Sequence, residues 1–160
     1  MMAGQTTAGF DGLRFAHWQV EPRSDGIVLV TIDRAGQAVN ALSQDMLIEL
    51  GALVERLAID PPRGVVFRSG KSSGFIAGAD VNEFRGAANA SAVETEIGRA
   101  HAVIDRLEAL RVPTVAVIHG FCLGGGLEVA LACQSRIAID DARFGFPEVM
   151  LGLHPGLGGT

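Results

Sequence analysis

Two glutamates and a run of three glycines are the residues of this sequence whose types and spacing could do chemistry. The glycines, Gly124 to Gly126, remove every side chain from a turn, so backbone N–H groups at the start of the following helix can approach an anionic ligand. Glu128 stands on the first turn of that expected helix, in otherwise apolar sequence. Glu148 also lies among apolar residues, directly after a proline where a helical turn can begin. Isolated carboxylates beside accessible N–H groups suit acid–base chemistry next to a stabilised oxyanion.

Each of these features also has a purely structural explanation. The glycines can serve close helix packing with Glu128 paired to an arginine, and Glu148 can be a first-turn acid favoured by the helix dipole. Another side-chain-poor stretch, 76–80, taken alone is a tight strand-to-helix turn in which Asp80 caps a short helix through Phe84. Packing explains the three glycines and the acid separately, whereas an oxyanion site explains them together, so the sequence favours the site.

The elements that must position these residues follow from hydrophobic periodicity and from turn residues. Two apolar runs, 13–20 and 27–33, flank a turn and predict a β-hairpin. Helically spaced apolar residues follow two capping serines, Ser43 and Ser91. A short buried strand is expected at 64–67, further strands at 114–119 and 136–139, and a helix packed on all sides at 127–133. The alternation of strands and helices predicts an α/β domain with ligands near strand ends.

The composition narrows the class of protein. The sequence has 160 residues, 48% of them hydrophobic, which suits one domain with a real core. Its net charge of −5 gives no basic surface for nucleic acid or an anionic membrane. No apolar run reaches the ~18 residues that a membrane-spanning helix needs, so a cytoplasmic location is expected. The polar residues 1–10 are predicted to be a disordered leader ahead of a domain at 11–160.

The two cysteines, Cys122 and Cys133, each lie in apolar sequence and are expected to be buried free thiols. The four histidines are scattered, so the sequence does not support a metal site. The segment beginning at Gly70 lacks the glycine that a P-loop needs at position 65. Val129 stands where a dinucleotide-binding fingerprint requires its last glycine, and the G-x-S-x-G elbow of serine hydrolases is absent.

Five motifs, in order and spacing, resemble the crotonase (enoyl-CoA hydratase/isomerase) family. They are residues 75–80, 113–120, 124–128, 144–149 and 151–160. The resemblance covers nearly the whole chain beyond the leader, including Asn40-Ala41-Leu42. The stretch 76–84 is most similar to the N-terminal hydratase part of multifunctional fatty-acid β-oxidation α subunits, in which a 3-hydroxyacyl-CoA dehydrogenase follows. The resemblance implies a spiral of ββα units, the crotonase-like superhelix, here truncated before the family's C-terminal helices as a fragment of a longer protein.

The resemblance also implies a role for each candidate residue. The backbone N–H groups of Ala79 and Gly125 would form an oxyanion hole around the thioester oxygen. Glu128 and Glu148 would hold one water between them, with Glu128 as the base for attack on the β-carbon and Glu148 as the acid toward the α-carbon. The remaining expected substrate contacts are Ala77, Gly78, Asp80 and Gly124.

The implied activity is hydration of enoyl-CoA in fatty-acid β-oxidation. An alternative is Δ3-Δ2-enoyl-CoA isomerisation, which family members can manage with the acid matching Glu148 alone; another is a non-catalytic acyl-CoA-binding module. The retained pair of glutamates argues against thioester hydrolysis or dehalogenation. Coenzyme A enters with the substrate, no metal or redox cofactor is implied for this part, and NAD is expected only if a dehydrogenase domain follows.

The partners implied for the full-length protein are a second copy, a following domain or a thiolase subunit. Arg34 is either a contact for a coenzyme A phosphate or a solvated loop residue.

Overall fold

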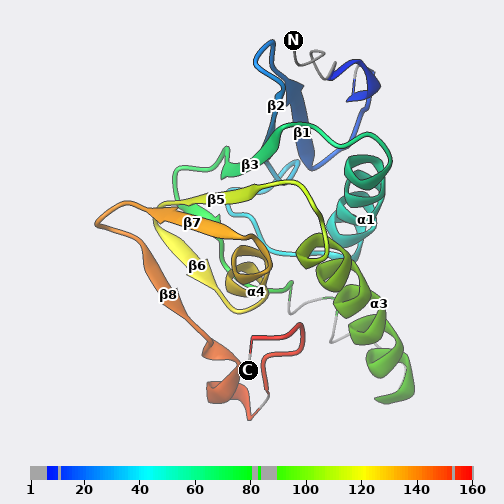
Figure 1. The fold of residues 1–160 in the computed structure, drawn as a ribbon. Helices are drawn as coiled ribbons and strands as arrows, with labels where there is room; N and C mark the ends of the chain where they lie inside the picture. Colours follow the sequence, from blue (N-terminus) through cyan, green and yellow to red (C-terminus); the bar gives the residue numbers. More distant parts are fainter. Residues whose placement is uncertain (1–6, 11, 81–82, 84–89, 153, 160) are drawn as a thin grey trace.

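A computed structural model describes residues 7–10, 12–80, 83, 90–152 and 154–159, and two β-sheets form its frame (Figure 1). The large sheet has the strand order β1-β2-β3-β5-β7, and the small sheet has the order β4-β6-β8. Strands of the large sheet are β1 Trp18–Pro22, β2 Ile27–Ile32, β3 Gly64–Ser69, β5 Thr114–Ile118 and β7 Ser135–Ala138. Those of the small sheet are β4 Gly74–Ile76, β6 Phe121–Leu123 and β8 Arg143–Gly145. The helices are η1 Thr7–Phe10, α1 Gln44–Ile59, α3 Ala90–Glu108, α4 Gly125–Ala132 and η2 Pro147–Leu151.

The chain moves repeatedly from the large sheet to the small one. Strand β3 is followed by β4, β5 by β6, and β7 by β8. The units that begin with β5 and β7 each continue into a helical segment, α4 and η2 respectively. Apart from the antiparallel β1–β2 hairpin, the strand pairs of both sheets are parallel. Each pair of consecutive strands, one from each sheet, therefore lies beside the preceding pair, and the chain forms a spiral.

The α/β class and the hairpin predicted from sequence are confirmed, although β1 starts at Trp18 and not at residue 13. The small sheet was not predicted. Residues 121–123, where the sequence predicted no strand, form β6 and pair with β4 and β8. Strands of three residues are too short to display an alternating pattern, which is the sequence signal for a strand.

Helix α1 is confirmed together with its cap, because Ser43 Oγ accepts a hydrogen bond from the Met46 N–H at 3.3 Å. Its buried face carries the predicted apolar residues. The cap predicted for α3 at Ser91 is wrong, because the helix already includes Ala90. Among the described residues, no helix is both long and apolar enough to cross a membrane. The short helix predicted from Asp80 through Phe84 falls largely outside the described residues.

The predicted disordered leader must be shortened. Thr7–Phe10 form the 3₁₀ turn η1, and the Phe10 side chain is only 2% exposed. The Arg56 guanidinium lies 5.9 Å from the centre of the Phe10 ring, an arrangement that suits a cation–π contact. Residues 1–6 of the predicted leader lie outside the described residues.

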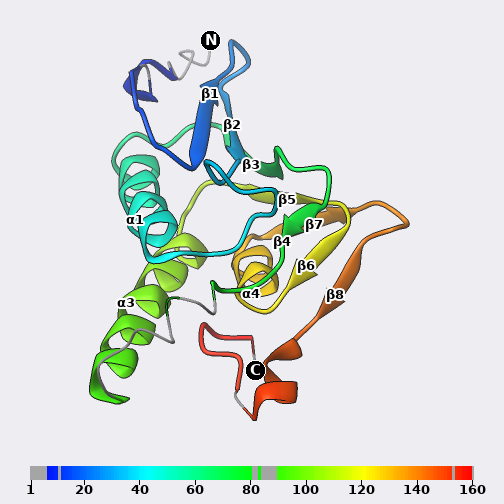
Figure 2. The same ribbon diagram turned by 180° about the vertical axis from the view of Figure 1, so that it is seen from behind.

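Helix α4 contacts strands of both sheets and is the element that connects the fold to the candidate site (Figure 2). It begins at Gly125, two residues before the predicted start. Most of its residues are buried, but Leu131 is 44% exposed, so the prediction of a helix packed on all sides is wrong on that face.

The expectation of two buried free thiols is confirmed for Cys122 and Cys133. Burial raises the pKa of both thiols to about 12 from a usual value of 9.0. Because the thiolate is the reactive form, neither cysteine should be alkylated by iodoacetamide at pH 8 in the folded protein, and both should react in denaturant. Mass spectrometry of the treated protein checks this, and modification of either thiol without denaturant would contradict it.

The same pKa shift makes stability depend on pH. The unfolded chain loses its thiol protons near pH 9, whereas the folded chain holds them until about pH 12. The stabilisation is therefore fully present below pH 9 and is lost as the pH rises toward 12.

Candidate active site

Two side-chain-poor turns lie next to each other at the ends of β4 and β6. These strands are paired in parallel, with Ile76 opposite Cys122, so the 77–80 turn and the 124–126 turn leave the same edge of the small sheet. A Cβ placed on Gly126 would lie 2.5 Å from the carbonyl oxygen of Ile76. Glycine at this position therefore allows the start of α4 to pack directly on the end of β4.

In the 77–80 turn, the N–H of Ala79 donates to no backbone acceptor among the described residues. Ala77 N donates to Asn40 O, and Asp80 N donates to Leu42 O, each at 2.8 Å. Leu42 N in turn donates to Gly78 O at 2.8 Å, which completes a parallel bridge between Leu42 and Ala79. In this pattern the N–H of Ala79 points away from Leu42, and it has no acceptor among the residues described. Ala79 is exposed, so a ligand can reach this N–H.

In the 124–126 turn, the N–H without an acceptor among the described residues is that of Gly125. Gly124 N donates to Gly145 O of β8 at 2.9 Å, and Gly124 O accepts the N–H groups of Leu127 and Glu128. Gly125 is the first residue of α4, so its N–H has no partner within the helix, and the described part of the chain offers no other acceptor. Among the described residues, the N–H groups of Ala79 and Gly125 have no acceptor, whereas Ala77, Asp80 and Gly124 use their N–H groups, and Gly78 its carbonyl, to hold the turns.

Glu128 is buried, with 3% of the residue exposed, and its orientation is set by the C-terminal segment. Its Oε1 accepts the N–H groups of Leu157 at 2.6 Å and Gly159 at 3.0 Å. Figure 1 shows this segment, in red, passing beside α4. Oε2 lies 3.9 Å from the position that a Cβ would take on Gly125. The second carboxylate oxygen is therefore on the side of the predicted oxyanion donor.

Glu148 reaches the same turn from η2, where Pro147 opens the helical turn as predicted. A Cβ on Gly124 would collide with Glu148 Oε1, and Gly124 has a φ of 50°, which also favours glycine. Glu148 Oε2 is buried and has no hydrogen-bond partner among the described residues. Leaving a buried polar atom unpaired costs about 1–3 kcal/mol, so this oxygen is a candidate ligand contact. The two carboxylates face two adjacent glycines.

An ion pair that sequence reasoning missed lies beside the 77–80 turn. Arg34 Nη2 and Asp80 Oδ2 are 2.6 Å apart, and the two side chains are 16% and 14% exposed. Arg34 is thus not the solvated loop residue that was one alternative, and Asp80 has a structural partner. Opposite charges 46 residues apart leave no local sequence signal for such a pair. Within the described ranges, no cluster of histidine, cysteine or acidic residues could hold a metal ion.

The amino-acid sequence of this chain is similar to one protein family and to several relatives. Residues 22–160 match the family model described as Enoyl-CoA hydratase/isomerase. The chain is 48% identical over 144 residues to the fatty acid oxidation complex subunit alpha of Idiomarina loihiensis, and 44% identical over 141 residues to that of Shewanella sp. (strain W3-18-1). These alignments cover 88% and 86% of this chain, which spans 20% of the length of each relative.

Solved structures show the same fold. An enoyl-CoA hydratase from Bacillus anthracis superposes with a TM-score of 0.82 at 33% identity, covering 89% of this chain and 55% of the other. Pseudomonas aeruginosa DspI gives a TM-score of 0.84 at 32% identity, covering 93% of this chain and 56% of its own. The crotonase-like ββα spiral predicted from the resemblance is therefore confirmed.

Proposed function

Because this chain belongs to the enoyl-CoA hydratase/isomerase family, we propose that it adds water across the 2,3 double bond of enoyl-CoA thioesters in fatty-acid β-oxidation. The observation that carries the proposal is the convergence of Glu128 and Glu148 on adjacent glycines of one turn. The N–H groups of Ala79 and Gly125, which have no acceptor in the described part of the chain, supply the donors that the reaction needs. The substrate is an acyl-CoA thioester, and the curated relatives are subunits of fatty acid oxidation complexes.

The proposed chemistry assigns one step to each group. Glu128 takes a proton from a water as the water oxygen bonds to the β-carbon, and the π electrons of the double bond move toward the thioester. Negative charge develops on the thioester oxygen, where the N–H groups of Ala79 and Gly125 hold it. Each such donor is typically worth about 3 kcal/mol of barrier. Glu148 then gives its proton to the α-carbon.

The proton balance of this scheme closes without a redox cofactor. Water supplies a hydroxyl to the β-carbon, and one proton reaches the α-carbon. Glu128 ends protonated and Glu148 ends ionised, and exchange with solvent restores both. Coenzyme A takes part only as the thioester portion of the substrate, and we propose no metal for this part of the protein.

The geometry favours hydration over isomerisation because two carboxylates are directed at the turn. An isomerase moves one proton between carbons and can do so with a single acid, which would leave Glu128 without a task in a buried site. A module that only binds acyl-CoA would have no use for the unpaired Glu148 Oε2. Both alternatives give distinct results in the experiment below.

The test is hydration of crotonyl-CoA by the complete natural gene product. We expect loss of the ultraviolet absorption of the conjugated thioester, with 3-hydroxybutyryl-CoA as the product in mass spectrometry. A rise in that absorption from a 3-enoyl-CoA, without hydration of crotonyl-CoA, would identify an isomerase. Binding without either reaction would leave an acyl-CoA-binding module and end the proposal.

A place in a fatty acid oxidation complex is part of the proposal and is supported by the relatives' names. A following dehydrogenase domain, a thiolase subunit as partner and a cytoplasmic location stay predictions. The length of the natural gene product and the proteins that co-purify with it test the first two.

A further inference from the structure

Asn40 is a fully buried polar residue beside the ends of β2 and β3 and the middle of β4. Its side-chain Nδ2 lies 3.0 Å from Ile32 O, from Ser69 Oγ and from Phe75 O, which share its two protons. These acceptors belong to the last residue of β2, the last residue of β3 and the middle of β4. The side-chain Oδ1 accepts the N–H of Arg34 at 2.9 Å. The residue is 0% exposed, so these partners satisfy its amide away from bulk solvent.

Asparagine is the side chain that this position requires. The amide presents N–H donors to three acceptors and an oxygen to one donor, and these partners assign its orientation. Aspartate would put two oxygens against the carbonyl groups of Ile32 and Phe75. An apolar residue would leave those carbonyls and the Arg34 N–H without partners.

The main chain that follows Asn40 connects this amide to both predicted oxyanion donors. Asn40 O accepts the N–H of Ala77, and Leu42 is hydrogen bonded on both sides of Ala79. The Leu42 side chain reaches the other turn, where its Cδ1 lies 3.1 Å from the position of a Cβ on Gly125. The segment 40–42 therefore sets the position of the 77–80 turn and touches the 124–126 turn.

We propose that Asn40 is a positioning residue for the oxyanion hole: its buried side-chain amide fixes the segment 40–42, and that segment aims the Ala79 N–H at the thioester oxygen. The inference rests on the proposed function and adds a residue that never touches substrate. A displacement of about 1 Å at a catalytic group can lower a rate by about 100-fold, so a small shift of this segment is enough to matter.

The test compares N40S and N40D with T114V in the complete natural gene product. Serine keeps one donor for a carbonyl, so N40S should fold, whereas N40D is the stronger perturbation. Thr114 is the matched control, because it is also buried, at 1% exposure, and its Oγ1 accepts the Gln134 N–H at 2.9 Å. Thr114 is the first residue of β5 and pairs with Val65 near the start of β3, whereas Asn40 lies where β2 and β3 end, so the two residues are at opposite ends of the parallel strands.

Four quantities are measured for each variant: kcat and KM for crotonyl-CoA, the thermal unfolding midpoint, and the infrared stretch of bound butyryl-CoA labelled with ¹³C at its carbonyl. Butyryl-CoA has no double bond and cannot be hydrated. Its carbonyl stretch falls in frequency when N–H donors polarise the bond, so it reports on the oxyanion hole directly. We expect N40S to lower kcat by about 10-fold or more, with KM changed much less.

In N40S the frequency of the carbonyl stretch should move back toward that of free butyryl-CoA, and in N40D this change in frequency should be larger. T114V should lower the unfolding midpoint while leaving kcat and the carbonyl stretch at wild-type values. The proposal is overturned if N40S and N40D, like T114V, change only the midpoint.

The outcome also separates this inference from the proposed function. If the wild-type protein binds butyryl-CoA with a lowered stretch but hydrates nothing, the hydratase assignment fails and the stretch of N40S still tests Asn40. If wild-type protein hydrates crotonyl-CoA and N40S matches it in kcat and stretch, the function stands and the role of Asn40 falls. A wild-type protein that neither binds nor reacts ends both.

Discussion

Replacement of Glu148 by glutamine should lower kcat for hydration of crotonyl-CoA by about 10²- to 10⁴-fold in the complete protein, the range typical of general acid catalysis. Glutamine has nearly the same shape and can still donate and accept hydrogen bonds, but its amide cannot deliver a proton to the α-carbon. The carboxylate lies against Gly124 with a buried, unpaired oxygen, and an isosteric amide fits the same space. Butyryl-CoA binding, measured by calorimetry, should therefore survive.

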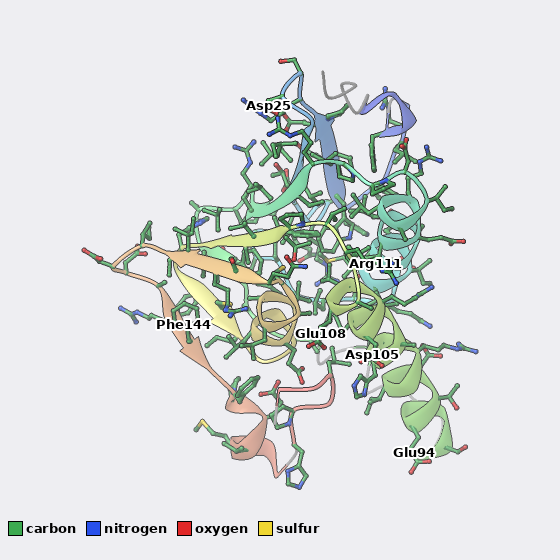
Figure 3. The ribbon with its side chains drawn as sticks, viewed as in Figure 1. Asp25, Glu94, Asp105, Glu108, Arg111 and Phe144 are labelled. Atoms are coloured by element: carbon green, nitrogen blue, oxygen red, sulfur yellow. The ribbon has the colours of Figure 1, made fainter. Side chains whose placement is uncertain are left out.

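The matched control is Glu94→Gln. Figure 3 shows Glu94 toward the far end of α3, away from η2, and its side chain is exposed. The control makes the same change of side chain without touching the site, so its kinetics should equal those of the wild type. Near-normal turnover by Glu148→Gln would remove Glu148 from the mechanism, and equal losses in both variants would show that the loss does not come from the site.

Replacement of Gly125 by valine should lower kcat/KM by about 10²- to 10³-fold, as loss of one oxyanion donor does in other enzymes. A single Cβ at this position meets Leu42 Cδ1 at 3.1 Å, the far end of a flexible side chain, so the fold can accept it. The added methyl groups of valine would stand between the Gly125 N–H and a thioester oxygen. Steady-state kinetics together with the butyryl-CoA carbonyl stretch separate a lost hydrogen bond from lost binding.

Substitutions at two other glycines, Gly98 and Gly126, serve as controls for Gly125→Val. Gly98 lies in α3 with nothing within 4 Å of an added Cβ, so Gly98→Val should leave the kinetics unchanged. Gly126 is different from its neighbour, because an added Cβ would lie 2.5 Å from both the Cβ and the carbonyl oxygen of Ile76. Gly126→Ala should therefore lower stability first. Wild-type kinetics in Gly125→Val would argue against an oxyanion role for its N–H.

The sequence by itself determined the features that depend on neighbours along the chain. The helical spacing and the Ser43 cap predicted α1, and the proline before Glu148 predicted the turn of η2, because a few adjacent residues decide a cap or a helix start. The resemblance in five ordered motifs likewise led to the family and to the ββα spiral. Local patterns misplaced the start of α3 and the end of the leader, where Phe10 is drawn into the core.

Only the tertiary structure decided which amides are free and which side chains hold the site. Glu128 receives its two N–H donors from residues 29 and 31 positions away, and Arg34 pairs with Asp80 across 46 positions. The burial of Asn40 depends on the ends of β2 and β3 meeting the middle of β4 around one point. Such partners follow from strand register and sheet packing, which bring distant segments together and leave no pattern in either segment alone.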